Sequence, residues 1–139
     1  MTDIMAGIGL AQLDKYQKLL SRRKEIIYKY NEGLKDLDVQ ILNHYDENHN
    51  SSGHLYLVRI NGISGEQRNE IITDGKKGIA CNVHYKPLPL LTAYKKLGFD
   101  IKDYPNAYNQ FINEVTLPLH TKLSDDDINY ILKKLCELL

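Results

Sequence analysis

The first 35 residues constrain the fold more than any other stretch, because they predict one long helix. Apolar residues recur there at spacings of three, four and seven, which places them in one stripe along a helix. Residues 4–13 differ, since they are apolar on nearly every side and include glycines and alanines that would let another backbone approach closely. The stripe consists of Leu13, Tyr16, Leu20, Ile27, Tyr30 and Leu34.

A helix over residues 2–35 would span roughly 50 Å at 1.5 Å per residue. The rest of a 139-residue chain can hardly enclose both ends of such a helix. We therefore expect residues 1–35 to link this chain to another domain or subunit, with the apolar start as the contact surface. The alternative is that the start folds back into the chain's own core.

Length and composition predict one domain without a nucleic-acid or membrane partner. Lysine plus arginine equals aspartate plus glutamate at 18 each, so the basic stripe of a nucleic-acid binder is not expected. No apolar run reaches membrane-spanning length and no leader pattern opens the chain, which favours the cytoplasm. Cys81 and Cys136 lie far apart in apolar patterns and are expected to be buried free thiols.

Residues 79–85 predict a short strand that ends at Pro87, because proline fixes its own φ and restricts Lys86. Alternation puts Asn82 and His84 on a polar face, and polar groups gain little from burial without a partner. We therefore expect these two side chains to point at something outside the domain's own core. The opposite, apolar face carries Ile79, Cys81, Val83 and Tyr85.

Before this stretch, residues 36–53 predict a polar loop with turn chemistry. His44 and His49 flank the most polar part of that loop and are expected to be solvated rather than metal ligands. Residues 54–60 are almost continuously apolar, which predicts a strand covered on both faces.

Two capping patterns mark helices. Ser64 and Gln67 fit a capping box for a helix that ends near residues 75–78, where Lys76 and Lys77 suit the negative helix end. Ser124 and the acidic residues 125–127 predict the start of an amphipathic helix that runs to the end of the chain. Further short helices are expected over residues 90–97, stopped at Gly98, and from Tyr104-Pro105 through Tyr108, Phe111, Ile112 and Val115.

A third strand is expected over residues 116–120, at a sheet edge because Pro118 lies inside it. The order of elements predicts an α/β fold: a small sandwich over residues 54–139, with a three-stranded, antiparallel or mixed sheet, helices packed on it and the long helix in front.

No motif of a common catalytic site occurs, since a phosphate-binding glycine loop, a nucleophile elbow and a zinc-type cysteine cluster are all missing from the sequence. The aspartates 125–127 fit helix capping better than acid catalysis. Asn82, His84 and Tyr85 are the residues placed to bind a ligand, with His120 as a possible neighbour across the sheet. No catalytic, cofactor-binding or metal-binding residue is expected.

Several segments together resemble the C-terminal domain of the DegT/StrS family of sugar aminotransferases. The likeness runs in order over essentially the whole chain, although each motif alone is weak. The matching segments are residues 1–13, Arg22-Arg23 followed by Tyr30-Asn31 and Leu34, residues 54–58, Gly78-Ile79 through Val83-His84-Tyr85-Lys86-Pro87-Leu88, residues 93–98 and residues 117–125.

The resemblance implies an enzyme that uses pyridoxal phosphate to move an amino group, typically from glutamate, onto a nucleotide-linked keto sugar. In the family, the Schiff-base lysine lies in a large N-terminal domain that this sequence does not contain. The resemblance therefore implies a fragment that is inactive and binds no cofactor alone, with the large domain and a second subunit as partners. His84, Tyr85 and Asn82 would border the substrate cleft. The alternative from another class is a non-catalytic α/β interaction module, with the apolar helix start as a homodimer contact and His84 as a structural residue.

Overall fold

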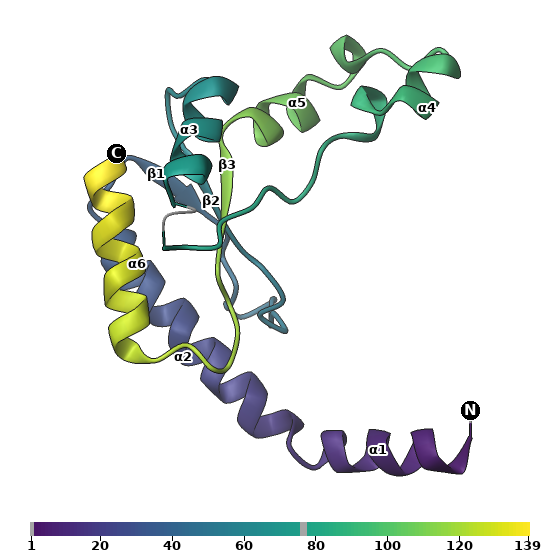
Figure 1. Ribbon diagram of the computed structural model, residues 1–139, viewed down its shortest axis with the longest axis vertical. Helices are drawn as coiled ribbons and strands as arrows, with labels where there is room; N and C mark the ends of the chain where they lie inside the picture. The colour runs from purple at the N-terminus through teal and green to yellow at the C-terminus, as the bar shows by residue number, and fades with distance from the viewer. Residues whose placement is uncertain (1, 76–77) are drawn as a thin grey trace.

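The structure, a computed structural model, describes residues 2–75 and 78–139 (Figure 1). The expected role of Lys76 and Lys77 at a helix end lies outside the described residues. The elements are α1 (Asp3–Leu13), α2 (Tyr16–Leu34), β1 (Val39–Ile41), β2 (Tyr56–Ile60), α3 (Gly65–Gly75), the 3₁₀ turn η1 (Leu88–Leu90), α4 (Thr92–Lys96), the 3₁₀ turn η2 (Ile101–Asp103), α5 (Pro105–Ile112), β3 (Glu114–Leu117) and α6 (Asp125–Leu138).

The predicted α/β class is confirmed, and the sheet is fully antiparallel in the order β1-β2-β3. Val58 at the centre of β2 lies opposite Ile41 of β1 and Val115 of β3. The alternate β2 residues Tyr56, Val58 and Ile60 are buried, while Leu57 and Arg59 between them are half-buried. The strand predicted to be covered on both faces therefore has one fully buried face, which lies on the core.

Helices α2 and α6 lie side by side and complete that core (Figure 1). The buried Tyr30 of α2 packs its ring 4.8 Å from the ring of Tyr56, and its hydroxyl donates to the carbonyl of Pro118 at 2.8 Å. This hydrogen bond satisfies the buried hydroxyl, so Tyr30 anchors α2 against the sheet. The buried residues of α6 are Ile128, Ile131 and Leu135.

The predicted long helix is broken into two. The amide of Lys15 bonds the carbonyl of Gln12, three residues back, so the chain tightens into a 3₁₀ turn between α1 and α2. As a result α1 projects away from the rest of the molecule (Figure 1).

No residue of α1 is buried, and Ile4, Ile8 and Leu10 are 78%, 54% and 65% exposed. The expectation that this chain does not enclose the apolar start is confirmed. The alternative of folding back into the core is wrong.

The predicted strand over residues 79–85 is wrong. Only Asn82 forms a bridge, which pairs its amide and carbonyl with those of Thr116 at 3.2 and 2.8 Å. The side-chain oxygen of Asn82 then accepts from the amide of Val83, and a carboxylate accepts from the amide of His84. Side-chain acceptors therefore replace the strand carbonyls that a ladder would need.

Two other strands differ from expectation. The loop over residues 36–53 contains β1, whose three residues are too few to give a periodic signal. The last strand, β3, starts earlier than predicted and ends before Pro118, whose ring has no N–H for a ladder. Val115 therefore lies in this strand and not in α5, and the predicted edge position within the sheet is confirmed.

Burial corrects two further predictions. His44 is only 6% exposed, whereas the other loop histidine, His49, is solvated as predicted. Cys136 is exposed and Cys81 half-buried, so neither thiol is fully buried, although both are free. Among the described residues, no helix is long and apolar enough to cross a membrane.

Candidate functional site

The predicted ligand-binding residues lie along the outer edge of β3. His84 is half-buried, and its ring meets the ring of Tyr85 edge-on with centroids 4.6 Å apart. Tyr85 is 70% exposed, so its predicted place on the core-facing side is wrong. The structure brings His84 and Tyr85 together, while Asn82 uses its backbone for the bridge to Thr116 and leaves its side chain exposed.

His84 is held from behind by two side chains of β3, one at its ring and one at its backbone N–H. Its Nδ1 lies 2.9 Å from the hydroxyl oxygen of Thr116, and its backbone N–H donates to Oε2 of Glu114 at 2.9 Å. The Thr116 hydroxyl itself donates to Oε1 of Glu114. Residues 114 and 116 alternate with the core-facing Val115 and Leu117, so both polar side chains fall on the same face of the strand.

Glu114 is 1% exposed, and Arg68 of α3 donates a hydrogen bond to its backbone carbonyl. Burial raises the pKa of its carboxyl, and the two hydrogen bonds together with the charge of Arg68 oppose that shift. The guanidinium of Arg68 is also buried, lies 4.9 Å from the centre of the Phe111 ring and donates to the carbonyl oxygens of Phe111 and Glu114. The carboxyl therefore belongs to a buried polar network.

Sequence reasoning missed this network. The available signal was one acidic residue, Glu114, directly before the apolar run of a strand. A second signal was Arg68 three and four residues before the core residues Ile71 and Ile72 on one helix. Charged residues almost never bury without a partner, so an acid beside a buried strand and an arginine on the buried face of a helix together indicate a buried cluster.

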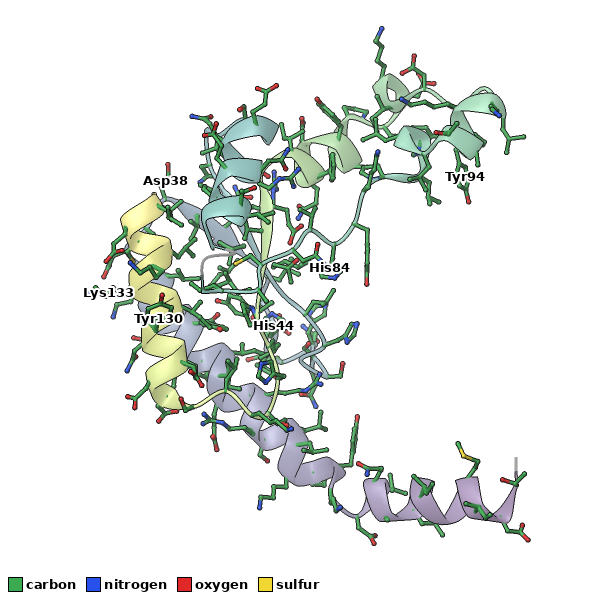
Figure 2. All side chains as sticks on the ribbon, viewed as in Figure 1. Asp38, His44, His84, Tyr94, Tyr130 and Lys133 are labelled. Carbon is green, nitrogen blue, oxygen red and sulfur yellow. The ribbon has the colours of Figure 1, made fainter. Side chains whose placement is uncertain are left out.

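Two other histidines singled out by the sequence, His44 and His120, also lie outside this site, and Figure 2 labels His44 apart from His84. His44 stacks on Tyr56, with centroids 5.6 Å apart, and burial lowers its pKa. His120 is exposed and lines a cavity of about 190 Å³ with Asp127 and Tyr130. The predicted approach of His120 to His84 is therefore not found.

A larger cavity, of about 580 Å³, lies between the end of α2, the start of α3 and the end of α6. Its lining mixes apolar side chains with the acidic Asp36, Asp38 and Glu70, and it contains none of the three predicted site residues. Within residues 2–75 and 78–139, no group of three or more acidic, cysteine or histidine side chains could hold a metal ion. The edge of β3 thus remains the candidate site, as one open wall rather than a closed pocket.

The fit to pyridoxal phosphate can be tested on the lysines, because this cofactor forms a Schiff base with a lysine amine in an enclosed site. No lysine among the described residues is buried, and Lys29, one of the less exposed, forms an ion pair with Asp125. The described residues therefore do not fit the cofactor's aldehyde.

The sequence matches the DegT/DnrJ/EryC1/StrS aminotransferase family over residues 1–136. The chain is similar to Spr1654 of Streptococcus pneumoniae, a proposed sugar aminotransferase whose apo form superposes with a TM-score of 0.95 at 55% identity, covering 99% of this chain and 35% of that chain.

Curated relatives include the spore coat polysaccharide biosynthesis protein SpsC of Bacillus subtilis, 30% identical over 137 residues (96% of this chain, 35% of SpsC). Another is the UDP-4-amino-4,6-dideoxy-N-acetyl-beta-L-altrosamine transaminase of Helicobacter pylori, 28% identical over 132 residues (94% of this chain, 35% of that protein). The chain thus spans about a third of the length of the relatives it matches.

Proposed function

Because the chain belongs to the DegT/DnrJ/EryC1/StrS aminotransferase family, we propose that it forms the C-terminal small domain of a pyridoxal-phosphate-dependent sugar aminotransferase. The complete enzyme would move an amino group from an amino acid such as glutamate to a nucleotide-linked keto sugar. The observation that carries the proposal is the similarity to Spr1654, which extends over nearly the whole chain and whose solved forms include a PLP form.

Within that enzyme, Asn82, His84 and Tyr85 would bind substrate rather than transfer protons. Support comes from the exposed Tyr85 ring, which lies edge-on to a histidine held in place by two strand side chains. Since the wall they form is open, the rest of the cleft would come from the large domain and the second subunit of a dimer.

Helix α1 would pack on that large domain or on the second subunit. Its support is the exposure of its apolar residues, among them Ile4 and Leu10, together with Gly7 and Gly9, where an added Cβ would meet no atom within 4 Å beyond the adjoining helix backbone. Burying such a surface against a partner is favourable at about 25 cal/mol per Å² of apolar area.

The Schiff-base lysine would lie outside this chain, so the chain alone would be inactive and would not bind the cofactor covalently. The measurement is the absorbance of the purified chain after addition of pyridoxal phosphate and borohydride reduction, with the complete enzyme as the positive control. A lysine-dependent cofactor band in the chain alone, or turnover of an amino acid and a keto sugar, would contradict this part of the proposal.

The proposed binding role is tested by His84→Ala in the complete enzyme. We expect KM for the sugar substrate to rise more than kcat falls, because the lost contact exists in both the ground state and the transition state. Lys86→Ala, an exposed neighbour two residues on, serves as the matched control. A large loss of kcat at unchanged KM would instead assign His84 to the chemical step.

A further inference from the structure

The hydrogen bonds behind His84 form a chain with a defined direction. The carboxylate of Glu114 accepts at both oxygens, from the backbone N–H of His84 on Oε2 and from the hydroxyl of Thr116 on Oε1. A hydroxyl has one proton, so Thr116 can only accept from its other neighbour, Nδ1 of His84. With Glu114 ionised, Nδ1 then carries the proton.

The second ring nitrogen of His84, Nε2, is an acceptor where Nδ1 is a donor. In a neutral imidazole one nitrogen is the donor and the other the acceptor, so a proton on Nδ1 leaves a lone pair on Nε2. None of the described residues forms a hydrogen bond with Nε2. The atom that His84 offers to a ligand is therefore an acceptor.

We infer that Glu114 and Thr116 are positioning residues that select the Nδ1–H tautomer of the His84 imidazole, so that Nε2 accepts a hydrogen bond from a hydroxyl or ammonium group of the substrate. A carboxylate or phosphate oxygen has no proton to give and would meet the Nε2 lone pair unfavourably. The statement about substrate rests on the proposed function, whereas the tautomer does not. This tautomer limits the substrate group that Nε2 of His84 can contact to a sugar hydroxyl or an amine.

The direct test is the tautomer of His84 in the 139-residue chain labelled with ¹⁵N-histidine. Long-range ¹H–¹⁵N correlation spectra at about pH 8, where imidazoles are neutral, distinguish the two ring nitrogens. His84→Gln identifies the signal among the five histidines. We expect the population of the Nδ1–H tautomer to exceed that of the Nε2–H tautomer by at least about tenfold. In the Nε2–H tautomer the lone pairs of Nδ1 and of the Thr116 oxygen would face each other, which would leave buried acceptors unsatisfied.

Glu114→Gln should reverse the tautomer. The His84 backbone N–H requires the amide oxygen at the Oε2 position, which places the amide NH₂ against Thr116. The hydroxyl then accepts from the amide and donates to Nδ1, so the ring proton moves to Nε2. A residue that only filled space would leave the tautomer unchanged.

Thr116→Val removes the hydroxyl at nearly constant shape, and we expect it to abolish the excess of Nδ1–H. Thr116→Ser keeps the hydroxyl and should restore that excess, which separates hydrogen bonding from packing. An Nε2–H ring in the unaltered chain, or equal tautomer ratios in all variants, would overturn the inference. If the tautomer behaves as expected while the complete enzyme shows no sugar aminotransferase activity, only the proposed function fails.

Discussion

At the scale of single residues, the two thiols illustrate how environment sets reactivity. Cys81 packs beside the core, and burial raises the pKa of its thiol to about 11. Cys136 lies near the end of α6 and is exposed. Since the thiolate is the reactive form, Cys81 should be protected both by burial and by its protonation state.

We predict that iodoacetamide at about pH 8 modifies Cys136 first. A pKa about two units above the ordinary value leaves roughly a hundredth of the usual thiolate, so Cys81 should react only slowly in the folded chain. Mass spectrometry of Cys136→Ser and Cys81→Ser variants measures each rate separately. Equal rates in the folded chain would show that Cys81 is freely accessible, and both thiols should react alike in urea.

At the scale of elements, the start of α6 combines a cap with two ion pairs to α2. Ser124 and Asp127 form a reciprocal capping box, in which the Ser124 hydroxyl accepts from the Asp127 amide at 3.1 Å and the Asp127 carboxylate accepts from the Ser124 amide at 2.8 Å. Asp125 bonds Arg22 and Lys29 of α2. These ion pairs are solvent-exposed, so the cap is expected to contribute more stability than they do.

We predict that Ser124→Ala lowers the free energy of unfolding by about 1 kcal/mol, the usual effect of losing an N-cap oxygen. Urea denaturation measures this, and Ser124→Asp, which keeps a capping oxygen, is the matched control. No change in Ser124→Ala would mean that water caps the helix equally well.

The capping box also makes the stability of the folded chain depend on pH. Hydrogen bonds from Ser124 lower the pKa of Asp127 below its ordinary 3.8. A lowered pKa in the folded state means that the contribution is present above pH 3.8 and is lost as the pH falls through the folded value. Ser124→Ala keeps the backbone N–H, which is the larger cause, and removes the hydroxyl that also donates to Asp127. The part of the stability difference between the chain and this variant that comes from the hydroxyl bond to Asp127 should therefore shrink on acidification below pH 3.8.

At the scale of the whole molecule, α1 is separable from the fold. It has no buried residue, and its contacts are with the first part of α2 (Figure 1). Its apolar side chains add little to the stability of the isolated chain because they stay in water. They are available to a partner instead.

We predict that deleting residues 2–13 changes the free energy of unfolding by no more than about 0.5 kcal/mol, as for surface changes in general. Sedimentation should show that self-association of the chain falls with the deletion, since the exposed apolar surface is gone. The double variant Ile4→Glu, Leu10→Glu keeps the length and should have the same effect. A loss of several kcal/mol would place α1 in the core, and unchanged association would rule it out as a contact between copies.

The sequence by itself determined the features whose causes are local. The capping box at Ser64, the N-cap at Ser124 and the amphipathic α6 follow from neighbours three or four residues apart. The strand β2 follows from its short, almost continuous apolar run. The sequence also predicted that the chain does not enclose the apolar residues 4–13, because a helix that is apolar on every side needs more surrounding protein than a short chain supplies. The resemblance of ordered segments added the family.

Tertiary structure alone decided what depends on distant partners. Residues 79–85 do not form a strand because side-chain oxygens accept from their backbone amides. The Asn82 side chain accepts from the amide of Val83, and the Glu114 carboxylate, 30 residues along the chain, accepts from the amide of His84. For the same reason the hydrogen bonds that orient His84 could not be read from spacing. A local pattern records which face a side chain prefers, whereas the donor or acceptor that it finally meets is set by how the whole chain folds.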